Sequence, residues 1–325
     1  MKVLITGGAG FIGSHLADEL IASGNEVIVL DNLSTGRFEN IAHLYKNKKF
    51  HFVEETILNE SLVDKLVEKS DVVYHLAAAV GVDLIVKKPL ESLVTNIKGS
   101  EIVLDMVHRY HKKVLITSTS EIYGKNTNGP LKEEDDRILG SPLKSRWGYS
   151  TAKAVDEMLA YIYWKEKKVP TVIVRLFNTV GPRQTGAYGM VVPRFVNQAL
   201  KGEDITIYGT GKQSRCFLHV KDAVETLIKL MNNKDVVGKV FNIGSQEEIT
   251  IEDLAKKIIK ITKSRSKIVY ISYDKAYEEG FEDMQRRVPD TTKVKRAVGF
   301  SPTIDLEGTI KSVVEYCKQE KISSC

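Results

Sequence analysis

Residues 2–20 read KVLITGGAGFIGSHLADEL, and this stretch decides the fold. A short apolar run is followed by Gly7, Gly10 and Gly13, spaced three apart, and then by a helical pattern. Gly7 permits a tight turn, Gly10 lets the backbone approach a phosphate, and Gly13 lets helix and strand pack closely. The free N–H groups at the start of the helix favour a phosphate-bearing ligand. The stretch therefore predicts a strand, a phosphate-binding turn and a helix.

A carboxylate follows the second apolar run of the chain. The run covers residues 27–30, and Asp31 and Asn32 come directly after it. A carboxylate at the end of the second strand suits the hydroxyls of a ribose and repels a 2′-phosphate. Together with the glycine turn, Asp31 predicts that the cofactor is NAD rather than NADP.

Strand-like and helical patterns alternate through the first half of the chain, which predicts an α/β fold with a doubly wound parallel sheet of the Rossmann type. Beyond about residue 178 the rhythm becomes less regular and turns are more frequent. The expected strands lie at 3–5, 27–30, 72–74, 114–116 and 172–174, and the expected helices at 14–23, 61–69, 91–111 and 149–167.

The second half predicts a smaller α/β substrate-binding lobe. Residues 240–245 could add one more strand to the large sheet, and residues 251–262 have the spacing of an amphipathic helix. We expect an NAD-binding domain of residues 1–177 plus about 217–244, and a substrate-binding lobe of about 178–216 plus 245–325.

Composition narrows the class of protein. Of 325 residues, 42% are hydrophobic and 27% charged, which is ordinary for a globular chain. The net charge is +5 without a long basic run, so nucleic acid is not an expected partner and a small anionic ligand is sufficient. Cys216, Cys317 and Cys325 have neither disulfide-framework nor metal spacing, so we expect no metal and a reduced, cytoplasmic setting. The sequence contains no apolar stretch long enough to span a membrane.

Tyr149 and Lys153 form a candidate catalytic pair. They are four positions apart on a predicted helix, so both side chains lie on one face, one turn apart. A nearby ammonium and a positive nicotinamide ring favour the phenolate form of a tyrosine. A phenolate can take the proton of an alcohol while hydride leaves the carbon.

The end of the fourth predicted strand raises a question. Residues 116–126 read ITSTSEIYGKN, where four hydroxyl residues precede Glu121. Hydroxyl side chains are common where a strand ends at a crevice. A carboxylate at such a position calls for a structural or functional explanation. In extended backbone Thr119 and Glu121 would point the same way.

At this point the chain resembles the extended short-chain dehydrogenase/reductase family, in its branch that modifies nucleotide sugars. The resemblance covers almost the whole length. It rests on GGAGFIG (7–13), YHLAA (74–78), Asn96 with Gly99, TSTSEIYG (117–124), RLFNTVGPR (175–183), YGTGKQSRCFLHVKDA (208–223) and RRVPDTTK (286–293).

The resemblance implies roles for individual residues. Thr119 would share the substrate O4 proton with Tyr149, and Asn178 and Arg215 would hold a nucleotide diphosphate, with Arg287 as a further candidate. An acidic residue that usually meets the adenine is replaced here by Thr56. The NAD site would consist of Gly7, Gly10, Phe11, Ile12, Gly13, Asp31, Asn32, Ala77, Asn96, Tyr149 and Lys153.

Glu121 bears on the reaction within this branch. The segment around it resembles UDP-glucuronate decarboxylases and GDP-mannose 4,6-dehydratases, and Arg146 matches both groups. The resemblance implies that the substrate is a hexose attached to a nucleotide, with UDP as the first expectation. C4 of the hexose would be oxidised, and Glu121 would then act at C5. NAD would be recycled inside each turnover. A UDP-sugar 4-epimerase is the alternative. An alcohol dehydrogenase that exchanges free NADH and a non-catalytic NAD-binding sensor are more distant alternatives.

A homodimer is also expected. In the resembling family the helices that match residues 91–111 and 149–167 form a four-helix bundle between two subunits. The apolar residues expected to exceed the needs of one sheet face are Ile102, Val103, Met106, Val155, Met158, Leu159 and Ile162.

Overall fold

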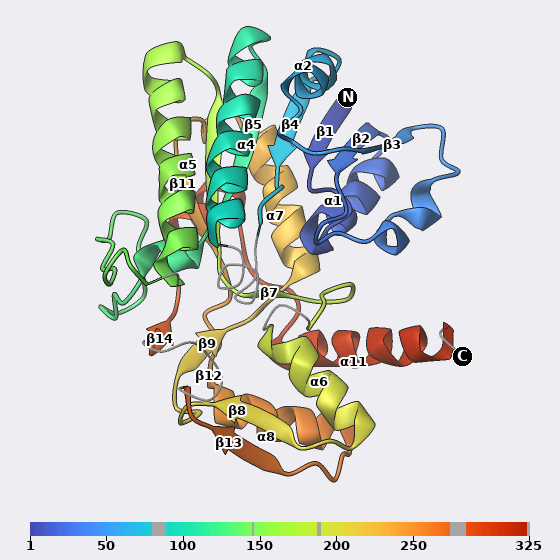
Figure 1. The fold of residues 1–325 in the computed structure, drawn as a ribbon, viewed down its shortest axis with the longest axis vertical. Coiled ribbons are helices and arrows are strands. Elements are labelled where there is room, and N and C mark those ends of the chain that lie inside the picture. The colour runs from blue at the N-terminus through green and yellow to red at the C-terminus, as the bar shows by residue number, and fades with distance from the viewer. Residues whose placement is uncertain (80–88, 145, 187–189, 274–283, 324–325) are drawn as a thin grey trace.

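The computed structural model describes residues 1–79, 89–144, 146–186, 190–273 and 284–323 (Figure 1). Its centre is a seven-stranded parallel sheet with the order β11-β6-β5-β4-β1-β2-β3. The strands predicted at 3–5, 27–30, 72–74, 114–116 and 172–174 and the additional strand at 240–245 are confirmed, whereas β3 is not among the predicted strands. The strands of the sheet are β1 Lys2–Thr6, β2 Glu26–Asp31, β3 Phe50–Glu54, β4 Val72–His75, β5 Lys113–Thr119, β6 Thr171–Leu176 and β11 Val240–Ile243.

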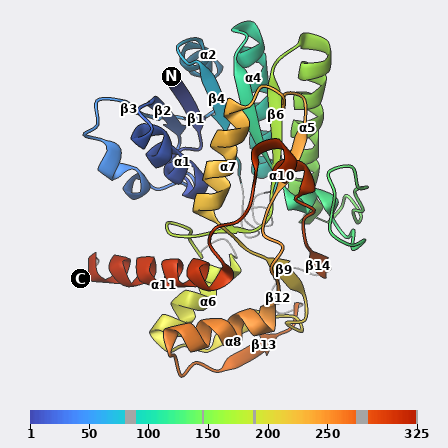
Figure 2. The same cartoon turned by 180° about the vertical axis from the view of Figure 1, so that it is seen from behind.

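Helices cover both faces of this sheet (Figures 1 and 2). Successive strand residues alternate between the two layers, so Val3 and Ile5 join one apolar core and Leu4 joins the other. The first core packs against α1 (Phe11–Ala22), α7 (Val220–Asn232) and α10 (Thr292–Val298), and the second against α2 (Glu60–Glu68), α4 (Pro89–Arg109) and α5 (Arg146–Lys167).

The apolar surface of α4 and α5 differs in part from the expectation. Ile102, Val103 and Met106 are buried in the second core, because α4 packs between α2, α5 and the sheet. The prediction that they form an extra exposed face is therefore wrong. Met158 and Ile162 are 60% and 42% exposed, as expected of an uncovered face. Other exposed apolar side chains of the two helices are Leu90, Leu93, Val94 and Tyr161.

A smaller lobe lies below the carboxyl ends of the strands in Figure 1. Its core joins α6 (Val191–Lys201), α8 (Ile251–Thr262), α11 (Leu306–Ser323) and the parallel pair β8 (Ile205–Tyr208) and β13 (Ile268–Ile271). The amphipathic helix predicted at 251–262 is thus confirmed. Short strands line the boundary between the lobes: β7 (Thr179–Val180) pairs with β10 (Leu218–His219), and β9 (Ser214–Cys216) lies between β12 (Glu248–Thr250) and β14 (Arg286–Arg287).

The strand order places the functional site. After β1, β2 and β3 the chain crosses to β4 on the other side of β1, so the direction of strand addition reverses there. Open parallel sheets bind ligands outside the carboxyl ends of the strands at such a reversal. The smaller lobe faces this edge and can close a cavity against it.

Candidate active site

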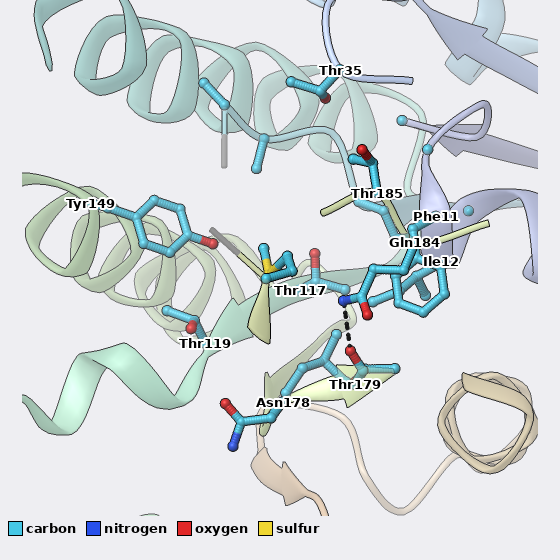
Figure 3. Close-up of a pocket in the computed structure, with 18 of the residues that line it drawn as sticks. Phe11, Ile12, Thr35, Thr117, Thr119, Tyr149, Asn178, Thr179, Gln184 and Thr185 are labelled. Carbon is cyan, nitrogen blue, oxygen red and sulfur yellow. Dashed lines mark hydrogen bonds between the residues drawn. The ribbon is translucent and has the colours of Figure 1, made fainter. Parts of the chain in front are cut away.

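A cavity of about 610 Å³ lies between the carboxyl ends of the strands and the smaller lobe. The glycine turn, the ends of β2, β4, β5 and β6, and the first turns of α5 contribute to its wall (Figure 3). Of the predicted site residues whose side chains the structure describes, all except Asn96 line it. Arg146 begins α5, and its side chain lies outside what the structure describes.

The glycine turn needs glycine for steric reasons. Gly7 has φ +72°, and a Cβ there would lie 2.7 Å from the backbone nitrogen of Ala77. A Cβ on Gly13 would lie 2.2 Å from the carbonyl oxygen of Gly7. Gly10, which lines the cavity, bonds the Gly7 carbonyl through its own N–H. The turn thus brings bare backbone to the cavity wall, as a phosphate-binding turn requires.

Asp31 lies at the far end of β2 with its carboxylate held by the backbone. Its two oxygens accept hydrogen bonds from the N–H groups of Ala9 and Leu33, each at 2.9 Å. Burial raises the pKa of the carboxyl, and these bonds oppose the rise. Each oxygen keeps a second lone pair that can accept a ribose hydroxyl.

Asn96 acts on the cavity through another segment. Its amide donates to the Ala79 carbonyl at 3.2 Å and accepts from the Ala79 N–H at 2.7 Å. Asn96 is 2% exposed and does not line the cavity. It therefore fixes the backbone of residues 77–79, which does line the cavity, rather than reaching a ligand itself.

Three buried polar atoms in the cavity wall fit a polar ligand. Ser118 Oγ, Thr179 Oγ1 and Gln184 Oε1 have no hydrogen-bond partner among the described residues. Gln184 donates through Nε2 to the Thr179 carbonyl at 3.0 Å, and Figure 3 shows its amide beside Phe11 and Ile12. Sequence reasoning missed Gln184, although it directly follows the GPR of a quoted motif. Orphaned polar atoms beside the glycine turn fit a dinucleotide, whose riboses and amide offer the missing partners.

Tyr149 and Lys153 lie together in the cavity wall as predicted. Tyr149 is 8% exposed and Lys153 2%. Burial raises the pKa of Tyr149, and the charges of Glu121 and Asp156 raise it further. Lys153 donates to Asp156 Oδ2 at 2.9 Å, so its ammonium is partly neutralised. The positive ring of an oxidised nicotinamide, if bound here, would add charge that favours the phenolate.

The backbone around Glu121 differs from the expectation. Thr119 is extended, but the chain then turns into a 3₁₀ helix, η3 (Ser120–Tyr123). Thr119 Oγ1 caps it by accepting the N–H of Glu121 at 3.2 Å. The prediction of extended backbone across residues 119–121 is therefore wrong. Both side chains still line the cavity, since Thr119 ends β5 and Glu121 lies in the first turn of η3.

Arg287 brings the distant parts of the site together. Its Nη1 donates to Glu121 Oε1 at 2.6 Å and its Nη2 to Asn178 Oδ1 at 2.7 Å. Asn178 in turn donates to the Cys216 carbonyl at 2.8 Å. Arg287 is thus an ion-pair partner of Glu121.

Arg287 reaches this place through strand pairing. In β14 it is in register with Arg215 of β9, which also lines the cavity. Cys216, the residue after Arg215, is fully buried, and burial raises the pKa of its thiol to about 12. The cysteine therefore packs as a small apolar side chain.

The smaller lobe forms the other end of the cavity. Arg194 lies 4.3 Å from the ring centroid of Tyr208, and Gln213 donates to the Tyr208 carbonyl at 3.0 Å. An aromatic ring beside a guanidinium and an amide suits a nucleobase with its phosphates. Thr56 lines the opposite end, where the adenine of a dinucleotide is expected.

The described residues hold no group of three or more His, Cys, Asp or Glu side chains that could bind a metal ion. None of the helices in these ranges has the length and hydropathy needed to cross a membrane.

Comparison with known proteins gives three kinds of match. The family model described as GDP-mannose 4,6 dehydratase matches residues 4–313. UDP-N-acetyl-alpha-D-glucosaminuronate decarboxylase of Bacillus cytotoxicus is 42% identical over 319 residues, 98% of each chain. UDP-glucuronic acid decarboxylase 1 of Xenopus tropicalis is 36% identical over 98% of this chain and 72% of its own.

A solved structure adds the cofactor. UDP-glucuronic acid 4-epimerase of Bacillus cereus, in complex with UDP-glucuronic acid and NAD, has a TM-score of 0.89 and is 31% identical, over 98% of this chain and all of its own. These matches confirm the resemblance to nucleotide-sugar enzymes and the expected cofactor class.

Proposed function

Because the chain belongs to the family described as GDP-mannose 4,6 dehydratase, we propose that it is an NAD-dependent enzyme that decarboxylates a UDP-sugar whose C6 is a carboxylate. The observation that carries this choice is the ion pair between Arg287 and Glu121, which lines the same cavity as Tyr149 and Thr119. Oxidation of C4 alone needs the tyrosine, the lysine and a hydroxyl. An additional buried ion pair indicates chemistry at a neighbouring carbon.

The first step makes a ketone at C4. Bound NAD would accept the C4 hydrogen as hydride and return it at the end of the turnover. Tyr149, as phenolate, takes the proton from the O4 hydroxyl, and Thr119 holds O4 by a hydrogen bond. Lys153 places its positive charge beside the phenolate and the cofactor ribose. Each of these side chains lines the cavity.

The second step releases carbon dioxide. A C4 ketone makes the C6 carboxylate part of a β-keto acid, so the C5–C6 bond can break and leave its electron pair as a C4 enolate. The hydroxyls of Tyr149 and Thr119 can stabilise the enolate oxygen. A proton then adds to C5, hydride returns to C4, and Tyr149 gives its proton back to O4. The net change is uptake of one proton and loss of CO₂.

The Glu121–Arg287 pair favours this second step in two ways. Arg287 already binds Glu121 at 2.6 Å, so a substrate carboxylate entering the pair meets a negative charge as well as a positive one. This like charge destabilises the carboxylate more than neutral CO₂. Glu121 also serves as the acid/base group that passes a proton to C5.

The remaining residues bind the nucleotide and the cofactor. We assign Asn178 and Arg215 to the diphosphate side of the substrate, as the resemblance implies, and Arg287 to the sugar instead. The glycine turn and Asp31 hold the dinucleotide. Arg146 stays a predicted substrate-binding residue.

Product analysis separates this function from its alternatives. The enzyme is incubated in deuterated water with UDP-glucuronate, its 2-acetamido analogue, UDP-glucose and the GDP- and dTDP-hexoses, and product masses are measured. Loss of CO₂ with one solvent deuterium at C5 is expected for a uronate. Loss of water would identify a dehydratase. A product of unchanged mass without deuterium at C5 would identify a 4-epimerase and overturn the proposal.

A further inference from the structure

Helix α5 carries two consecutive buried acids that face different partners. Glu157 binds Arg175 through both oxygens, at 2.9 Å to Nε and 2.7 Å to Nη2. Asp156 is fully buried, and its Oδ2 lies 2.9 Å from the ammonium of Lys153. Its other oxygen, Oδ1, has no hydrogen-bond partner among the described residues. Glu157 therefore belongs to a complete structural pair, whereas Asp156 has only Lys153.

Helical spacing places Asp156 behind the candidate catalytic pair. Lys153 comes four positions after Tyr149, and Asp156 comes three positions after Lys153. The three side chains therefore follow one another along one face of α5. Tyr149 and Lys153 line the cavity, and Asp156 does not. The carboxylate thus holds the ammonium from its protein side and leaves its cavity side open to a ligand.

We propose that Asp156 is a positioning residue of the active site: through its buried ion pair it fixes the Lys153 ammonium and limits how much of that positive charge reaches the Tyr149 hydroxyl. The catalytic meaning of this inference rests on the proposed function. In the free enzyme the Lys153–Asp156 pair is neutral overall, so it favours the phenolate less than an unpaired ammonium would. Oxidised NAD, when bound, would supply a further positive charge that favours the phenolate.

Other titratable groups lie around Tyr149 and Lys153. Glu121 on η3 faces Tyr149, but its charge is offset by Arg287 of β14. His75 on β4 is fully buried, and burial together with the charge of Lys153 lowers its pKa to about 3, so it stays neutral at working pH. Burial is the largest cause that raises the pKa of Tyr149, and the charges of Glu121 and Asp156 add to it. Of these two acids, Asp156 can be neutralised without altering the group proposed to act at C5.

The test is a direct titration of Tyr149 in the NAD⁺-bound enzyme. Tyrosinate absorbance is followed against pH, and the same curve of the Tyr149→Phe variant is subtracted, which isolates this tyrosine from the others. For the Asp156→Asn variant, the curve of the double variant Asp156→Asn/Tyr149→Phe is subtracted in the same way. Asn keeps an oxygen that can accept a hydrogen bond from the Lys153 side chain. Removal of one negative charge should lower the titration midpoint by about one pH unit.

Controls distinguish this role from a structural one. Glu157→Gln also breaks a buried pair on the next residue, and it should lower stability without moving the midpoint. Asp156→Glu, which restores the charge, should return the midpoint towards that of the unchanged enzyme. If Asp156→Asn does not fold, Asp156→Ser removes the same charge and leaves room for water.

The outcome is decisive in either direction. Curves that coincide, or a midpoint that rises in the neutral variant, would overturn the role of Asp156. The titration uses no sugar, so its result does not depend on turnover. Failure to turn over any nucleotide sugar would count against the proposed function alone.

Discussion

Replacement of Glu121 by Gln should stop the reaction halfway. The change keeps the size of the side chain and an oxygen for Arg287 but removes the carboxylate. Loss of one acid/base group lowers a rate by about 10²–10⁴, or roughly 3–5 kcal/mol of barrier. The contact to Arg287 is short, at 2.6 Å, and the two side chains are 10% and 16% exposed. Weakening such a charged hydrogen bond costs about 2 kcal/mol of unfolding free energy.

The rate effect should fall on the C5 step alone. Tyr149 and Thr119 are unchanged in this variant, so oxidation of C4 still occurs. Mixed rapidly with a UDP-uronate, the variant should therefore accumulate NADH absorbance and a 4-keto sugar that borohydride can trap. The unchanged enzyme should show little of either, and its product should carry one solvent deuterium at C5.

A matched control uses a surface pair. Glu134 is paired with Lys293 at 2.9 Å and is 72% exposed, away from the cavity. Glu134→Gln should leave turnover and deuterium content as they are. Product formation by Glu121→Gln at the full rate would refute the C5 role. So would product from the unchanged enzyme without deuterium at C5, and the 4-epimerase interpretation would then replace ours.

Three further predictions follow from the site and the surface. Tyr149→Phe should nearly abolish turnover while NAD binding, measured by calorimetry, is retained; near-normal activity would mean that another group takes the proton. Asp31→Arg should weaken NAD and improve NADP, because the charge at the ribose is reversed, and an unchanged preference would remove Asp31 from the cofactor site. Met158, Tyr161 and Ile162 expose 60%, 46% and 42% of their surface on α5, so light scattering should give the mass of a homodimer and Met158→Lys should shift it towards a monomer. A strictly monomeric unchanged protein would contradict the dimer.

Local patterns predict most of the central sheet, because its information is local. Each parallel strand is buried on both faces, so it appears as a short apolar run bounded by helical spacing. The need for glycine at Gly13 is equally local, since a Cβ there would meet the Gly7 carbonyl, whereas Gly7 is required by the distant backbone of Ala77. The exposed face of α4 was harder to predict. Periodicity shows that Ile102 and Met106 lie on an apolar stripe but not that α2 and α5 already cover it.

The reaction depends on contacts that local pattern cannot supply. Arg287 and Glu121 are 166 residues apart, and Arg287 lies in a strand of only two residues, too short to show any alternation. Its position follows from pairing with β9, which sets Arg287 opposite Arg215. Periodicity likewise shows that Asp156 shares a helix face with Lys153, but only the packed structure shows that the carboxylate is fully buried. Tertiary packing thus brings a second buried charge pair into the cavity lined by Tyr149 and Thr119, and this is the pair that we propose for chemistry at C5. The residues of the C4 step follow one another within single motifs, whereas those of the C5 step meet only when the smaller lobe folds against the sheet.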